Sequence, residues 1–128
     1  MGQKEVRAGG VAFCNEGPLA YIAGPCVIET TASYEAEARE LKKIFAALKT
    51  PFVLKASFDK ANRTSHKAFR GIGMEGALSF LKDLKNRLGV PLLVDVHEPA
   101  QAARVAEAAD ILQVPAFLCR QTDLLYAC

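Results

Sequence analysis

Long apolar runs are missing from this sequence of 128 residues, although 51% of its residues are hydrophobic. No run approaches the roughly 20 apolar residues that a membrane-spanning helix needs. The first seven residues are too polar for a secretory signal peptide. Internal repeats, low-complexity tracts and linkers are also missing. We therefore expect one soluble domain, residues 1–128, with no membrane partner.

Cysteine is sparse, and its spacing excludes a secreted disulfide scaffold. The sequence has no C-x-x-C pair and no crowding of its four cysteines, which are Cys14, Cys26, Cys119 and Cys128. A domain of this length buries roughly two thirds of the surface that its unfolded chain exposes, so disulfides are not needed to stabilise the core. These features favour a reducing compartment, and we expect a cytoplasmic protein.

The sequence has almost no net charge, and this argues against a surface that coats nucleic acid. Sixteen Lys and Arg residues oppose fourteen Asp and Glu residues. The positive charge is concentrated in residues 55–70, which carry +4 while the remainder carries −2. This segment is either a solvated face or an anion site. Lys55 ends an apolar run, and a buried ammonium group needs an anionic partner. Few aromatic residues lie among these basic residues, whereas sites for single-stranded nucleic acid combine the two. We therefore expect a small-molecule phosphate or carboxylate rather than nucleic acid.

Short apolar runs bounded by Pro, Gly or charge predict four β-strands, and apolar stripes between them predict helices. The strands are expected at 19–23, 52–56, 92–96 and 111–114, and the helices at 34–48, 74–88, 99–109 and from 121 onward. Each strand is apolar on successive residues, so we expect buried strands of a parallel α/β sheet.

A glycine-bearing stretch from Gly9 to Pro18 precedes these units and predicts a hairpin. The pattern leaves two closures open. One is a small open α/β sandwich, which the length favours. The other is the first half of an eight-stranded barrel, which needs about 250 residues.

Polar and reactive residues follow each predicted strand. They are Gly24-Pro25-Cys26, residues 57–63, Asp95 with His97-Glu98, and residues 115–120. The carboxyl ends of parallel strands share one face, where ligands bind in α/β folds. We therefore place the candidate site at this face.

Several of these features have a second interpretation. Gly71 to Gly76 matches G-x-G-x-x-G, but the expected strand ends about 14 residues earlier, so a loop and helix entry explain it better than a dinucleotide site. Cys26 is either a buried thiol or a metal ligand or nucleophile, and we interpret the other cysteines as packing residues. Asp95 and Glu98 could form an acid–base pair, or Glu98 could cap the third helix.

Four longer motifs carry a resemblance to a known family. They are Ile22–Glu29 (IAGPCVIE), Lys55–Ser65 (KASFDKANRTS), Asp95–Glu98 (DVHE) and Gln113–Asp123 (QVPAFLCRQTD). The chain resembles the 3-deoxy-D-manno-octulosonate 8-phosphate synthase family from about residue 20 to its end without a gap. That family folds as a (β/α)₈ TIM barrel. The resemblance implies that this chain is an amino-terminal hairpin and about the first four βα units.

The resemblance also implies an activity. In that family, phosphoenolpyruvate condenses with D-arabinose 5-phosphate and water, giving 3-deoxy-D-manno-octulosonate 8-phosphate and inorganic phosphate. This transferase reaction forms a C–C bond and belongs to lipopolysaccharide biosynthesis. The family members are homotetramers, and the implied partners are the two small-molecule substrates, with no nucleic acid.

The implied phosphoenolpyruvate site lies on the strand ends. By resemblance, Lys55, Ser57 and Lys60 hold this substrate, with Lys60 near its carboxylate. Gln113 lines the same pocket. The implied catalytic residues are Lys60, Asn62, Asp95 and His97, of which Asp95 and His97 form the pocket floor.

The implied sugar phosphate site uses the positively charged segment from Lys55 to Arg70, which we call the basic loop. Asn62 would contact the pentose, while Arg63 and Thr64 would bind its phosphate. Phe117 and Arg120 resemble residues that complete this site across a subunit boundary. The position of Thr64 is more often Ser in the family, which keeps the hydroxyl.

Cys26 implies a divalent metal. Members that need a metal resemble this sequence in having Gly-Pro-Cys after the first strand, whereas metal-independent members have Asn there. We therefore predict the metal-dependent type with Cys26 as one ligand. The family's other ligands, a His, a Glu and an Asp, have no counterpart in this sequence.

Two alternatives remain. A related synthase of the shikimate route uses phosphoenolpyruvate with erythrose 4-phosphate and shares Gly-Pro-Cys, but its basic loop differs from the Ala-Asn-Arg found here. The other alternative is a non-catalytic half barrel that associates through unpaired strand edges.

Overall fold

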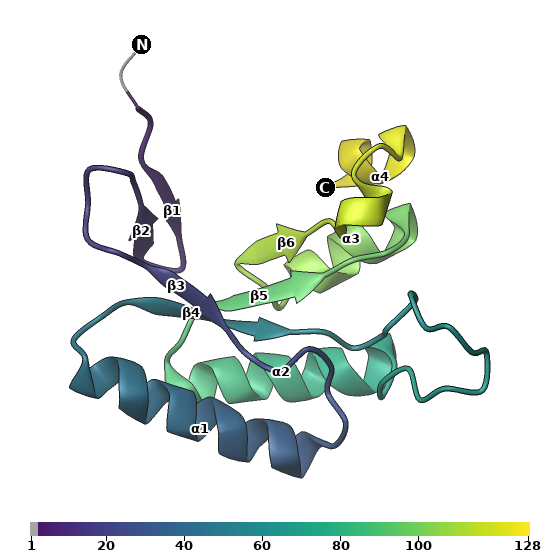
Figure 1. The fold of residues 1–128 in the computed structure, drawn as a ribbon, viewed down its shortest axis with the longest axis horizontal. Helices are drawn as coiled ribbons and strands as arrows, with labels where there is room; N and C mark the ends of the chain where they lie inside the picture. Colours follow the sequence, from purple (N-terminus) through teal and green to yellow (C-terminus); the bar gives the residue numbers. More distant parts are fainter. Residues whose placement is uncertain (1–2) are drawn as a thin grey trace.

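The computed structural model describes residues 3–128 and has an α/β architecture (Figure 1). A two-stranded antiparallel hairpin precedes a four-stranded parallel sheet. The strands are β1 (Val6–Ala8), β2 (Val11–Phe13), β3 (Tyr21–Ala23), β4 (Phe52–Ala56), β5 (Leu92–Asp95) and β6 (Ile111–Gln113). The helices are α1 (Thr31–Ala47), α2 (Met74–Leu88), α3 (Pro99–Ala106), the 3₁₀ turn η1 (Ala116–Leu118) and α4 (Thr122–Ala127).

The sheet order is β3-β4-β5-β6, and a helix follows each strand along the chain. Consecutive parallel strands joined through helices are βα units, so the predicted α/β class and its order are confirmed. The predicted bounds of β4 and α2 agree with the structure residue for residue.

Local signals explain where the two long helices begin and end. The side-chain oxygen of Thr30 accepts a hydrogen bond from the Ser33 N–H at 3.1 Å and caps α1. Gly89 ends α2 in the left-handed conformation, with φ of 62°, and its N–H donates to the Lys85 carbonyl at 2.8 Å. Both helices lie side by side along one face of the sheet (Figure 1).

Several predicted bounds are wrong. The first helix, expected at 34–48, is Thr31–Ala47, and the strands expected to end at 96 and 114 end at Asp95 and Gln113. The hairpin was placed from Gly9 to Pro18, but the glycines turn it and its strands end at Phe13. The first parallel strand begins at Tyr21, whose N–H donates to Pro51 O at 3.1 Å. The third helix ends at Ala106, because Asp110 exchanges backbone and side-chain hydrogen bonds with Leu92, both at 2.8 Å, and draws the chain into β6.

The two middle strands direct alternate residues to opposite faces of the sheet. On the helix side, Phe52, Leu54 and Ala56 of β4 join Leu92 and Val94 of β5 in the main core. On the other side, a second cluster forms beneath the hairpin, with Val11, Val53 and Leu93 as its buried members. The hairpin therefore covers the amino-terminal part of this second face and leaves the carboxyl ends of the strands uncovered.

The prediction that all four strands are buried is wrong for the outer two. β4 and β5 are buried, whereas Tyr21 and Ile22 of β3 are exposed and β6 is half-buried throughout. Each outer strand has a neighbour on one side only, so apolar composition does not ensure burial at these positions.

The packing role predicted for three cysteines is also wrong for two of them. Cys119 and Cys128 are exposed, and Cys14 is half-buried; all four cysteines are free. Within residues 3–128, no helix has the length and apolar character needed to cross a membrane.

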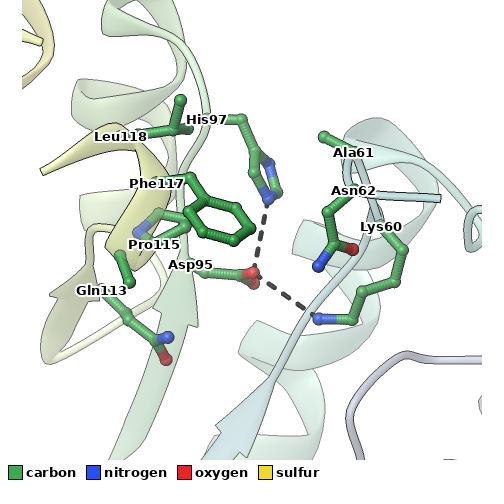
Figure 2. A pocket seen from close by; sticks show the side chains of 10 residues that line it. Lys60, Ala61, Asn62, Asp95, His97, Gln113, Pro115, Phe117 and Leu118 are labelled. Carbon is green, nitrogen blue, oxygen red and sulfur yellow. Dashed lines mark ion pairs between the residues drawn. The ribbon is translucent and has the colours of Figure 1, made fainter. Parts of the chain in front are cut away.

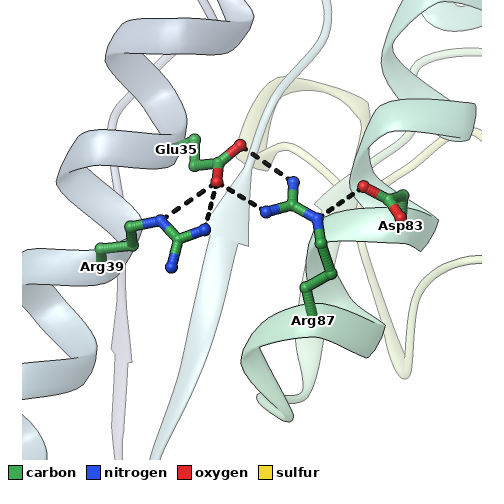
Figure 3. A network of polar contacts seen from close by, with 4 residues as sticks. All are labelled: Glu35, Arg39, Asp83 and Arg87. Carbon is green, nitrogen blue, oxygen red and sulfur yellow. Dashed lines mark hydrogen bonds and ion pairs between the residues drawn. The ribbon is translucent and has the colours of Figure 1, made fainter.

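An ion-pair network joins α1 to α2 (Figure 3). Glu35 accepts hydrogen bonds from Arg87 at 2.6 and 2.9 Å and from Arg39 at 3.0 Å, and Arg87 also donates to Asp83 at 2.7 Å. Hydrogen bonds from both arginines lower the pKa of Glu35 to about 2. The network connects residues 52 positions apart and fixes the two helices relative to each other.

We predict that this network makes stability depend on acid pH. The pKa of Glu35 is lower in the folded state than its usual 4.5, so its contribution is complete above about pH 4.5 and is lost as pH falls toward 2. Urea unfolding of wild type and Glu35→Gln should give a stability difference at pH 7 that shrinks steadily below pH 4.5. A difference independent of pH would contradict this. Glu40→Gln, which breaks an exposed pair with Lys43 within α1, is the control.

Candidate functional site

Strand register places polar side chains on the face that the hairpin leaves uncovered. Lys55 of β4 pairs with Leu93, and Asp95 of β5 pairs with Gln113 of β6. Since alternate residues share a face, Lys55, Asp95 and Gln113 lie on the same side of the sheet. The sequence predicts that the groups at the strand ends share one face, and the register places Asp95 on the face with Lys55 and Gln113.

Asp95 lies at the centre of this group and is 4% exposed (Figure 2). Its Oδ2 is 3.4 Å from Nε2 of His97 and 3.8 Å from Nζ of Lys60. Burial opposes ionisation, but the interaction with His97 and the charges of Lys60 and Lys55 outweigh it, so the pKa of Asp95 is lowered. The carboxylate is ionised at neutral pH and acts as the counter-charge for nearby cations.

Two buried polar atoms in this group have no hydrogen-bond partner among residues 3–128. They are Oδ1 of Asp95 and Nδ1 of His97. Buried polar atoms are nearly always hydrogen-bonded in native proteins, and exceptions concentrate where a ligand or water binds. Both atoms belong to side chains that line the pocket described next.

A pocket of about 430 Å³ opens above this floor (Figure 2). This volume lies within the usual range for small-molecule sites. One wall comes from the loop after β4 and the other from the segment after β6; the lining residues are Lys60, Ala61, Asn62, Asp95, His97, Gln113, Pro115, Ala116, Phe117 and Leu118. Six of the residues expected from sequence are thus brought together.

Lys55 and Ser57 lie beside this pocket but do not line it. Lys55 is half-buried, and burial, reinforced by the charge of Lys60 and opposed by Asp95 and Cys26, lowers the pKa of its ammonium group. Ser57 is fully buried and donates a hydrogen bond to the Asp59 carbonyl at 3.0 Å. Two lysines that share one buried carboxylate create a positive region, which suits an anionic ligand.

Three further expected residues lie outside the pocket lining. Arg63 and Thr64 are exposed on the basic loop, and the Arg63 Nε donates to the Phe69 carbonyl at 3.1 Å. Arg120 is exposed between η1 and α4. Phe117 lines the pocket while 88% of it is exposed to solvent.

Cys26 is exposed and lines a different hollow, together with Glu29, Tyr34 and Glu37 among others. Within residues 3–128, no three His, Cys, Asp or Glu side chains come close enough to hold a metal ion. The described residues alone therefore do not form a metal centre, and the role of Cys26 as a ligand stays a prediction.

Sequence reasoning missed Tyr34. Its hydroxyl donates to the Lys55 carbonyl at 2.6 Å, although its spacing in the first helix indicated only a core residue. Burial raises the pKa of this hydroxyl.

Glu98 occupies the cap position of α3 without a side-chain hydrogen bond, while Gln101 accepts one from the His97 N–H at 2.8 Å. Glu98 is exposed and lies outside the pocket.

Comparison with known proteins identifies the family. The model of the DAHP synthetase I family matches residues 3–128. The chain belongs to the DAHP synthetase I family. This is a family of TIM-barrel proteins, which agrees with the parallel α/β sheet described above.

Relatives within the DAHP synthetase I family carry a more specific name. Proteins named 2-dehydro-3-deoxyphosphooctonate aldolase from Rhodopseudomonas palustris (strain BisB5) and Brucella ovis are each 54% identical to this chain over 122 residues. One from Granulibacter bethesdensis is 53% identical. The alignments cover 95% of this chain and 42 to 44% of the relatives. The chain therefore spans less than half the length of these relatives.

We predict that Asp95→Asn destabilises the fold, because it removes the counter-charge of two partly buried lysines. The free energy of unfolding in urea should fall by about 1–3 kcal/mol at pH 7. The loss should shrink as pH falls below the usual Asp value of 3.8, since the folded-state pKa of Asp95 is lowered. Asp123→Asn, at an exposed position, is the matched control. Equal stability of the two variants would show that Asp95 is not a required counter-charge.

Proposed function

We propose that this chain forms the first half of an eight-stranded (β/α) barrel. In this proposal the barrel enzyme condenses phosphoenolpyruvate with D-arabinose 5-phosphate and water, releasing inorganic phosphate. The product is 3-deoxy-D-manno-octulosonate 8-phosphate, a lipopolysaccharide precursor. The observation that carries the proposal is the pocket over Asp95, Lys60 and His97, in a chain 53 to 54% identical to proteins named for an aldolase of this compound.

The chemistry of the pocket suits the first substrate. Phosphoenolpyruvate carries a carboxylate and a phosphate, and both need fixed cations or donors. Lys60 borders the pocket and would pair with the carboxylate, with Lys55 and Ser57 beside it and Gln113 on the facing wall. Asp95 fixes the ammonium group of Lys60 from below, and His97 would exchange a proton with the reacting groups.

The second substrate would lie toward the basic loop. Asn62 lines the pocket and would contact the pentose hydroxyls, while the exposed Arg63 and Thr64 would bind the phosphate. Phe117 and Arg120, both exposed, would complete this site in a homotetramer. Fixed cations around two phosphorylated anions offset their repulsion and hold the reacting carbons together.

Cys26 would supply one ligand to a divalent metal in this proposal. The remaining ligands must come from residues outside 3–128, because the described part of the chain has no cluster that could hold a metal. We derive no reaction step from the metal. Four free cysteines support the proposal of a cytoplasmic enzyme.

Substrate binding by this chain tests the proposal directly. Isothermal titration should show binding of phosphoenolpyruvate and of arabinose 5-phosphate, with arabinose 5-phosphate preferred over erythrose 4-phosphate. Lys60→Met should weaken phosphoenolpyruvate binding about tenfold or more, because it removes a charge-assisted hydrogen bond. Lys82→Met, on the exposed face of α2, is the control. Preference for erythrose 4-phosphate, or equal binding by both variants, would contradict the proposal.

A further inference from the structure

The basic loop projects from the body of the protein between β4 and α2 (Figure 1). Residues 61–67 are all exposed, and this stretch includes Asn62, Arg63 and Thr64. An exposed loop packs little apolar surface, so its conformation depends on its end contacts and on hydrogen bonds within it.

Arg70 contacts Asp59 and Lys60, the two residues at the start of the exposed loop. Its carbonyl accepts a hydrogen bond from the Lys60 N–H at 2.6 Å. Its guanidinium donates from Nε and Nη2 to the two carboxylate oxygens of Asp59, at 2.8 and 2.5 Å. This bidentate geometry is the strongest form of an Arg–carboxylate pair, although Arg70 is exposed and Asp59 is only half-buried. We refer to Asp59 and Arg70 as the loop clamp.

The two sides of the clamp are built into the fold. On the strand side, Phe58 is buried and lies edge-on to the His97 ring, with 5.9 Å between ring centroids. On the helix side, the Gly73 N–H donates to the Phe58 carbonyl at 3.1 Å. Gly71 has φ of +124°, and a Cβ there would lie 2.2 Å from the same carbonyl. The first two glycines of the G-x-G-x-x-G match therefore allow the start of α2 to pack against the end of β4.

We propose that Asp59 and Arg70 are positioning residues that hold the basic loop in its substrate-binding conformation. This inference rests on the proposed function, because the loop carries the groups assigned to the sugar phosphate. The clamp fixes the backbone of Lys60, whose ammonium group lies 3.8 Å from Asp95. It also limits the freedom of Asn62, Arg63 and Thr64. Ordering the loop in advance reduces the entropy that binding must otherwise remove.

Paired variants test the clamp. Asp59→Asn keeps the side-chain size and Arg70→Gln keeps a polar side chain, and each removes one charge. Each should weaken arabinose 5-phosphate binding roughly three- to tenfold in calorimetry and accelerate amide exchange of Lys60 and residues 61–69 by a similar factor. The double swap Asp59→Arg with Arg70→Asp should recover at least half of the loss on a logarithmic scale. Arg87→Gln, which breaks the ion pairs to Glu35 and Asp83, should change neither readout.

The two readouts separate the clamp from the proposed function. If wild type does not bind arabinose 5-phosphate, the proposed function fails, and amide exchange still decides whether the clamp orders the loop. Unchanged exchange and affinity in folded Arg70→Gln and Asp59→Asn would overturn the inference. A swap that leaves both readouts as poor as the single variants would also overturn it, because a clamp made by the pair must be restored by the reversed pair.

Discussion

The buried carboxylate of Asp95 is the charge on which the arrangement of the site depends. A carboxylate that is 4% exposed stays ionised only if cations or donors replace the water it has lost. These partners come from separate parts of the chain: Lys60 from the basic loop, His97 from just after the same strand, and Lys55 from the neighbouring strand. The need to neutralise one buried charge thus brings together groups that would otherwise repel or remain solvated.

Alternate residues of the same strands have two different roles. One set packs in the core and stabilises the fold, and the other set forms the site. Phe52, Leu54 and Ala56 pack against the helices, while Lys55 faces the other side. Beneath the hairpin that second side is apolar, and beyond it the side becomes polar at the carboxyl ends. A change on the helix side therefore acts first on the free energy of unfolding. A change at the carboxyl ends acts on charge balance and on the pocket.

Periodicity predicted the fold well where burial and sequence pattern coincide. The strand at 52–56 and the helix at 74–88 agree with the structure because both are bounded by Pro, Gly or charge and lie against the core. Prediction failed at the outer strands, since an apolar run such as Tyr21–Ala23 does not reveal whether it has neighbours on both sides. The third helix was predicted too long, since the hydrogen bonds of Asp110 that end it are tertiary contacts.

The candidate site, like the fold, could be predicted from the sequence only in part. The strand ends predicted that Asp95 and His97 lie at one face of the sheet. Gln113 was expected there only from the family resemblance, and the parallel register places it beside Asp95. The resemblance to a family was needed to assign substrates, to choose among the interpretations of Cys26 and to give Arg120 a role. The conformation of the basic loop depends on Asp59 and Arg70, a pair eleven residues apart that no local pattern reveals. Gly71 and Gly73, which follow the loop, match a dinucleotide motif only by their spacing.

A crystal structure of this chain with phosphoenolpyruvate would test the central claim most directly. The account predicts that the carboxylate or phosphate of the ligand lies within hydrogen-bond distance of Lys60 Nζ, above Asp95 and His97, while Asp95 keeps its contacts. Ligand density on another face of the sheet, or a pocket that stays free of ligand while Asp95 turns toward solvent, would contradict it.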